Sequence, residues 1–144
     1  KEIGIETIRI VFAIFIMFPF ICEAGAVSEL LDIFEEMGYP AWLMHTMPAS
    51  QVYPESFFTF LTTDAPFEAH YNNQPHSVVW AFEIGFYSSD PEKVERIPLE
   101  LTKRLRAAGW VVPGMGGDAQ SDEPTHTGWH FTAMRVQSIN NEEV

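Results

Sequence analysis

The sequence predicts an α+β fold, an antiparallel β-sheet of about four to six strands with two main helices packed on one face. Two segments carry apolar residues at helical spacing. The segments between and after them are rich in aromatic and β-branched residues or alternate between apolar and polar ones. The order along the chain is one helix, two to four strands, a second helix and two further strands. Such an order favours one sheet covered by helices on a single side.

The size and composition of the chain allow one packed core. It has 144 residues, of which 47% are hydrophobic and 14% aromatic, so we expect a single domain over residues 27–144. Twenty acidic residues against eight basic ones give a net charge of -12, which argues against specific nucleic-acid binding. The single cysteine, Cys22, excludes an internal disulfide and a cysteine-based zinc site.

Residues 1–26 form an apolar leader. Its core, Ile10–Cys22, is an unbroken run of thirteen apolar residues, whereas a membrane span needs ~20. The run and the small residues after it are typical of a secretory signal, although the acidic Glu2 and Glu6 are unusual there. Three alternatives stay open: a signal-like segment, an extra apolar helix, and a translation start placed too far upstream of Val27. A membrane partner is expected only if the leader is genuine.

The first helix is predicted after this leader. Apolar residues recur at helical spacing from Val27 to Met37, Ser28 is placed to cap the start, and Gly38 supplies the C-cap. The breaking pair Tyr39-Pro40 then ends the helical pattern.

Strands are predicted between this helix and the second one. Residues 41–46 and 56–62 are predicted strands, and residues 67–71 are expected to pair locally before a turn at 72–75. The longest candidate is 77–87, in which large apolar residues alternate with a mixed set. We expect its core face to consist of Val78, Trp80, Phe82, Ile84 and Phe86.

The second helix begins within Ser89-Asp90-Pro91-Glu92, where Ser89 is predicted to cap and Glu92 to complete a capping box. Pro98 is expected to kink this helix and Gly109 to end it. Residues 110–112 are then predicted to form a short strand, 113–123 a glycine-rich acidic loop and 126–136 a final strand. The apolar stripe of the helix is formed by Val94, Ile97, Leu101, Leu105 and Ala108.

The candidate chemistry is weak, and we expect no cofactor, no metal and no enzymatic activity. His126 and His130 would lie about 6 Å apart on a helix but roughly 13 Å apart on a strand, where they cannot share one ion. The glycines of residues 112–118 lack the lysine and the Ser/Thr of a phosphate-binding loop. A small hydrolase or metal-dependent enzyme that uses these histidines with Asp122 and Glu123 is a remaining alternative.

Residues 57–135 resemble a small tail component of long-tailed bacteriophages, of the tail-terminator type found where the tail tube meets the head. One part of the resemblance is the aromatic strand that runs into TTDAPF, the loop with Asn72-Asn73, and the strand VVWAFEIGFYSSDPEKVE. The other is the helix that closes with AAGW and leads into VPGMGGDAQSDEPTHTGWHFTAMRV. The resemblance covers about two thirds of the chain.

The resemblance implies a virion structural protein with a tail-terminator-like fold. It would be assembled in the host cytoplasm as a ring, commonly a homo-hexamer, that contacts the tail tube protein and the head–tail connector. The loops 66–76 and 113–124 are then candidate contact elements, and a basic helix would meet acidic loops across a heterologous interface. The interface candidates are Asn72, Asn73, Lys93, Arg96, Lys103, Arg104, Arg106, Asp118, Asp122, Glu123 and His126.

A secreted or membrane-anchored small binding domain is the alternative function. In that case residues 1–26 would target or anchor the chain, and its loops would hold a ligand.

Overall fold

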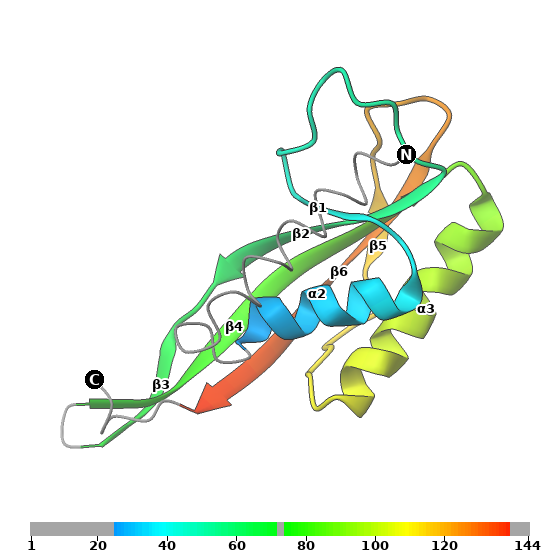
Figure 1. Cartoon of the computed structure of the whole chain (residues 1–144). Coiled ribbons are helices and arrows are strands. Elements are labelled where there is room, and N and C mark those ends of the chain that lie inside the picture. Colours follow the sequence, from blue (N-terminus) through cyan, green and yellow to red (C-terminus); the bar gives the residue numbers. More distant parts are fainter. Residues whose placement is uncertain (1–24, 72–73, 139–144) are drawn as a thin grey trace.

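The computed structural model describes residues 25–71 and 74–138, which form one sheet and two helices (Figure 1). The apolar leader up to residue 24 lies outside the described residues, as do Asn72 and Asn73, so the predictions about them stay predictions. The helices are α2 (Ala26–Met37) and α3 (Pro91–Ala107), and the strands are β1 (Ala41–Leu43), β2 (Ser56–Asp64), β3 (Phe67–Tyr71), β4 (Gln74–Ser88), β5 (Gly117–Ala119) and β6 (Thr127–Ser138).

The sheet confirms the predicted α+β class but is mixed. Its order is β1-β2-β4-β6-β5, and β3 also pairs with β4. Among these described strands, all pairings are antiparallel except that of β1 with β2, which is parallel. The expectation of a wholly antiparallel sheet is therefore wrong at one edge. The long connection 44–55 carries the chain back to the starting end of β1, so β2 runs in the same direction as β1.

Helix α2 packs against the centre of the sheet through aromatic rings. The Phe34 ring stacks on Phe58 with ring centroids 4.6 Å apart, and the centroid of Phe60 lies 6.0 Å from that of Phe34. Gly38 ends the helix as predicted, with a left-handed φ of 83° that glycine adopts without strain. The predicted Ser28 cap is wrong, because the helix begins earlier: Ala26 is already helical and Gly25 is the N-cap.

Helix α3 starts at an Asp90 cap rather than at the predicted Ser89 capping box. The Asp90 carboxylate accepts a hydrogen bond from the Glu92 backbone N–H at 3.0 Å. Pro91, which lacks an N–H, fits the first turn of the helix. The helix continues through the buried Pro98 to Ala107, and Gly109 lies beyond its end with a φ of 93°.

Both helices pack on the same face of the sheet. Their buried side chains join one core cluster with the inward residues of β2, β4 and β6. The predicted core face of β4 is confirmed, since Phe82, Ile84 and Phe86 are fully buried, Val78 is buried and Trp80 packs partly buried against the cluster.

The segment after α3 differs from the prediction. Residues 110–112 form only an isolated bridge, between Val111 and Met134, and β5 lies inside the predicted loop 113–123. Gly116 makes this possible, because a Cβ there would lie 1.9 Å from the His130 carbonyl oxygen. Gly116 therefore allows the chain to approach β6 closely.

A carboxylate on α2 joins three separate parts of the chain. Glu29 accepts a hydrogen bond from Trp110 Nε1 at 2.7 Å, and its other oxygen lies 3.4 Å from Arg135 Nε on β6. Trp110 itself is buried beside Phe82. This carboxylate therefore ties α2 to the sheet and to the segment after α3.

Replacing that carboxylate should destabilise the fold. We expect Glu29→Ala to lower the free energy of unfolding by about 1–3 kcal/mol, because the buried indole N–H loses its acceptor. Urea denaturation measures the change. Glu35→Ala is the matched control, since Glu35 is an exposed glutamate of the same helix and should shift stability by less than about 0.5 kcal/mol. Equal losses in the two variants would contradict this role.

Candidate interaction surfaces

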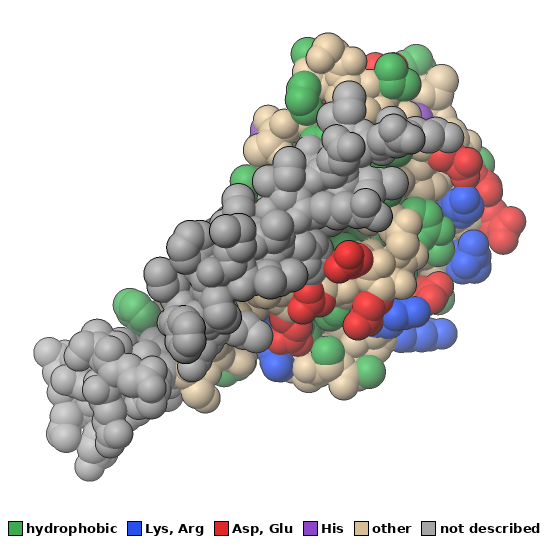
Figure 2. All heavy atoms as spheres, viewed as in Figure 1, with side chains coloured by type: hydrophobic (Ala, Val, Ile, Leu, Met, Phe, Trp, Pro, Cys, Tyr) green, Lys and Arg blue, Asp and Glu red, His purple; other side chains and the backbone are tan. Residues whose placement is uncertain are grey.

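The basic face of α3 is partly neutralised within the chain. Its paired cations are held by the ion pairs Lys93–Glu55 at 2.6 Å, Arg96–Glu92 at 3.7 Å, Arg96–Glu100 at 4.0 Å, Arg104–Glu36 at 3.7 Å and Arg104–Glu100 at 3.6 Å. The hydrogen bond to Glu55 also raises the pKa of Lys93. Figure 2 shows these acidic and basic side chains gathered over α2 and α3.

Lys103 and Arg106 are the exceptions on this helix. Both are exposed, and neither has an ion pair within residues 25–71 and 74–138. Of the five predicted cationic interface candidates, these two are the ones whose charge is left over for another molecule.

The predicted acidic candidates lie on β5 and on the connection from β5 to β6. Asp118 is exposed on β5, and Asp122 and Glu123 are exposed on that connection. No ion pair to these carboxylates exists in the described part of the chain.

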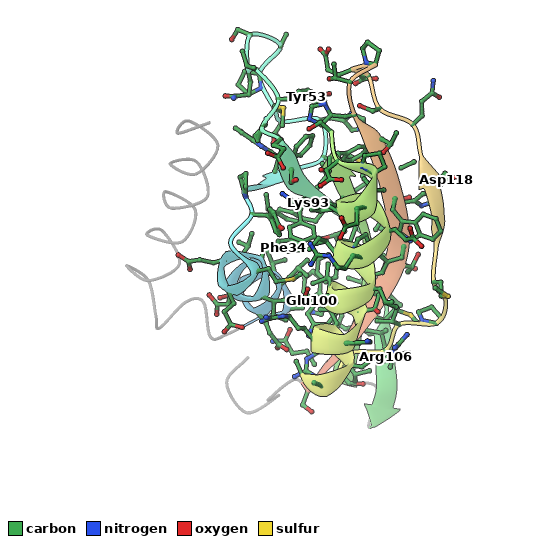
Figure 3. All side chains as sticks on the ribbon, turned by 90° about the vertical axis from the view of Figure 1, so that its right-hand side faces the viewer. Phe34, Tyr53, Lys93, Glu100, Arg106 and Asp118 are labelled. Carbon is green, nitrogen blue, oxygen red and sulfur yellow. The ribbon has the colours of Figure 1, made fainter. Side chains whose placement is uncertain are left out.

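Lys103 and Arg106 are separated from Asp122 and Glu123 along α3, whereas Asp118 lies beside that helix. Figure 3 places Tyr53 at one end and Arg106 at the other, with Lys93 and Glu100 between them along α3. Asp122 and Glu123 belong to the Tyr53 end, because they line a cavity together with that ring. The unpaired cations of α3 therefore lie apart from the unpaired carboxylates Asp122 and Glu123.

The two histidines considered for a metal have separate partners. His126 Nε2 donates to the Pro54 carbonyl oxygen at 2.8 Å, and its ring contacts Tyr53 at 5.2 Å. His130 Nδ1 lies 3.3 Å from a Glu83 carboxylate oxygen. Among the residues that the structure describes, no group of three or more His, Cys, Asp or Glu side chains is placed to hold a metal ion. His126 instead joins the two connections that cover one end of the sheet.

These connections enclose a cavity of about 550 Å³ on the face of the sheet opposite α2 and α3, and we call it the end cavity. Residues 44–55 form one wall and residues 120–123 another. The lining residues that matter most are Trp42, Tyr53, Phe57, Tyr87, Asp122 and Glu123. The cavity could not be predicted from the sequence, because its aromatic residues come from four separate segments.

Tyr87 lies flat over two glycines at the base of the end cavity. A Cβ on Gly128 would lie 2.5 Å from its Cε1 atom, and one on Gly85 would lie 3.2 Å from its Cε2 atom. The ring also stacks beside Phe57, with centroids 5.4 Å apart. The missing side chains of Gly85 and Gly128 therefore make room for the tyrosine ring on the sheet.

The ionisation of the cavity tyrosines reflects this environment. Burial raises the pKa of Tyr87, the charges of Glu83 and Asp122 add to the effect, and the Thr59 hydroxyl opposes it. Burial also raises the pKa of Tyr53, with Asp122 and Glu123 contributing next. The surroundings of both rings thus disfavour negative charge.

A second hollow lies between α3 and the β5 edge of the sheet. It measures about 630 Å³ and includes Leu99, Met115 and Trp129 in its lining. Trp129 Nε1 donates to the Met115 carbonyl oxygen at 2.7 Å, which holds the chain before β5 beside the strand. Leu99 and Met115 are exposed apolar residues, so this groove is a largely apolar surface.

A β-ribbon extends beyond the helices at the other end of the sheet. In Figure 1, β3 and the start of β4 project past α2, so the predicted contact loop 66–76 is largely a hairpin. Phe67 and Val136 carry exposed fractions of 58% and 53% on this part of the sheet. The ribbon and the neighbouring end of β6 therefore present apolar side chains that neither α2 nor α3 covers.

No protein-family model matches the chain, and a search of curated proteins finds no significant match. Within the described residues, none of the helices has the length and apolar character needed to span a bilayer.

Tyr87 gives a pH prediction. Its pKa is raised above the ordinary 10.0, so the folded chain holds this proton more tightly than the unfolded chain. The resulting stabilisation is present below about pH 10 and is lost as the pH rises through the raised pKa. We expect the free energy of unfolding to fall less steeply in Tyr87→Phe than in wild type above about pH 10. Denaturation at a series of alkaline pH values measures the slope.

Two further observations check this assignment. Phenolate absorbance should show one late-titrating tyrosine fewer in Tyr87→Phe, and the double variant Tyr53→Phe/Tyr87→Phe should flatten the stability profile further. Parallel profiles for wild type and Tyr87→Phe would show that the folded state does not raise this pKa.

Proposed function

We propose that the chain is a non-enzymatic structural protein of a bacteriophage tail, a tail terminator or a related component. It forms a ring at the end of the tail tube and joins the tail to the head. The observation that carries this proposal is the separation of unpaired charge. Lys103 and Arg106 lie near the C-terminal end of α3, and Asp122 and Glu123 lie with Tyr53 beyond its N-terminal end.

Such a separation suits a ring because ring contacts are heterologous. Each subunit must present two different patches, one to each neighbour. Opposite charges that lie close together in one chain pair internally, as Lys93 and Glu55 do. Lys103 and Arg106 are too far from Asp122 and Glu123 for this, so a second copy can satisfy both sets.

The other surfaces fit the partners that this function requires. The projecting ribbon with Phe67 and Val136, and the apolar groove beside α3, offer contact areas for the tail tube protein and the connector. The net charge of -12 suits a ring through which DNA passes without being held. In this proposal the ring is a homo-hexamer in the virion tail, and it needs no cofactor.

The solution mass of the full chain tests the proposal. Light scattering over a concentration series at two salt levels should find a ring-sized oligomer, weaker at high salt because exposed charges are screened. Reversing one patch with Lys103→Glu/Arg106→Glu should weaken association by roughly tenfold or more. Reversing the other with Asp122→Lys/Glu123→Lys should do the same.

The two reversed variants control for each other. Mixed in equal amounts, they should assemble again in alternation, because every contact in an even-numbered ring then joins opposite charges. Failure of the mixture to assemble, with both variants folded, would contradict contact between these patches. A strict monomer at every concentration would contradict self-assembly and favour the small binding domain instead.

A further inference from the structure

The end cavity has the lining of a binding site. Trp42, Tyr53, Phe57 and Tyr87 supply aromatic surface, while Asp122 and Glu123 supply negative charge. No lysine or arginine is among the lining residues described. Its volume of about 550 Å³ falls in the usual range of small-molecule sites, about 300–1,000 Å³.

We propose that the end cavity binds an organic cation of the alkylammonium class. Aromatic faces attract a cation through their negative quadrupole, and the attraction is strongest for groups that shed water easily, such as methylated ammonium. The carboxylates Asp122 and Glu123 add Coulombic attraction from one side of the cavity. The inference rests on the cavity alone and goes beyond ring assembly.

The orientation of Tyr87 supports this ligand class. One face of its ring lies against Gly85 and Gly128, which leaves the opposite face turned away from the sheet, toward the two covering connections. Phe57 stacks against this ring, with centroids 5.4 Å apart at an interplanar angle of 21°, and is itself only 2% exposed, so the half-buried Tyr87 supplies the aromatic surface here. Tyr53 meets Phe57 edge-on at 5.1 Å and forms an adjoining side.

Trp42 carries a buried, unpaired donor beside the end cavity. Its side chain lines the end cavity and is 97% buried (3% exposed), yet no acceptor for its Nε1–H lies within the described residues. Buried donors normally have a partner. The nitrogen has almost no accessible surface, so a ligand in the cavity does not reach it in this arrangement of the ring.

The charges of the cavity argue against an anionic ligand. Asp122 and Glu123 have no ion pair in the described part of the chain, so their charge is not cancelled locally. Both raise the pKa of Tyr53, so their field reaches the aromatic wall. A negative ligand would meet the same repulsion.

Calorimetric titration of the full chain with choline tests the inference, since choline combines a quaternary ammonium with a hydroxyl acceptor. Saturable binding is expected. The neutral isostere 3,3-dimethylbutan-1-ol has the same shape without the charge and should bind at least about tenfold more weakly. No saturable binding of any alkylammonium probe, or equal binding of choline and its isostere, would overturn the inference.

Variants locate the site. Asp122→Asn/Glu123→Gln removes the carboxylates from exposed positions and should weaken choline binding by about tenfold. The control Glu35→Gln/Glu95→Gln makes the same change of net charge at exposed helical positions outside the lining and should leave binding unchanged. Equal weakening in the two pairs would overturn the location, and far-ultraviolet circular dichroism confirms that both pairs are folded.

A second probe separates two sources of the ammonium group. Nα-acetyl-lysine methylamide presents the side chain that a protein partner would offer. Tighter binding of this probe than of choline would support the inference and identify a lysine of a partner as the source. Tighter binding of choline would support a free small molecule. Because both titrations measure ligand binding directly, failure of ring assembly leaves their result unaffected.

Discussion

The packing of both helices on one face of the sheet is the constraint on which the rest of the structure depends. The stack of Phe34 on Phe58 fixes α2 there, and Leu101 and Leu105 fix α3 beside it. The opposite face must then be covered by other means. At one end the connections 44–55 and 120–126 cover it and leave the end cavity, whereas at the other end Val136 stays exposed on it.

The charged side chains also fall into two groups, those that are paired within the chain and those that are not. The chain has few cations, and most of those on α3 are held by nearby carboxylates, with Arg135 held by Glu29. Exposed ion pairs of this kind contribute little stability each, so their main effect is to decide which charges remain for a partner. Lys103 and Arg106 remain near the C-terminal end of α3, Asp118 lies beside the length of α3, and Asp122 and Glu123 lie at the Tyr53 end.

Features encoded by a local period could be predicted from the sequence, whereas features that depend on distant residues could not. The helices, Gly38 as a C-cap and the core face of β4 are all encoded within a few turns or alternations of the chain. The parallel β1–β2 pair and β5 depend on where long connections bring the chain back. The charged interface candidates could be predicted from the sequence. Their ion pairs could not, because the partners Glu36 and Glu55 lie far away in the sequence. The end cavity could not be predicted either, because its lining residues come from separate segments of the chain.

Ring assembly and ligand binding are both proposed to use Asp122 and Glu123. The effect of the ligand on assembly is therefore informative. If Lys103 of a neighbouring subunit enters the end cavity, it competes with a small alkylammonium ligand for the same space. The ligand then lowers the affinity between subunits by the same factor by which assembly lowers the affinity for the ligand. If the neighbour's cations stay at the rim, the ligand and the neighbour bind together and the coupling is close to zero. The cavity is far larger than one ammonium group, and its floor is aromatic rather than charged. Charge alone would need only the exposed carboxylates, so the half-buried rings of Tyr53 and Tyr87 in the lining favour an occupant that enters the cavity.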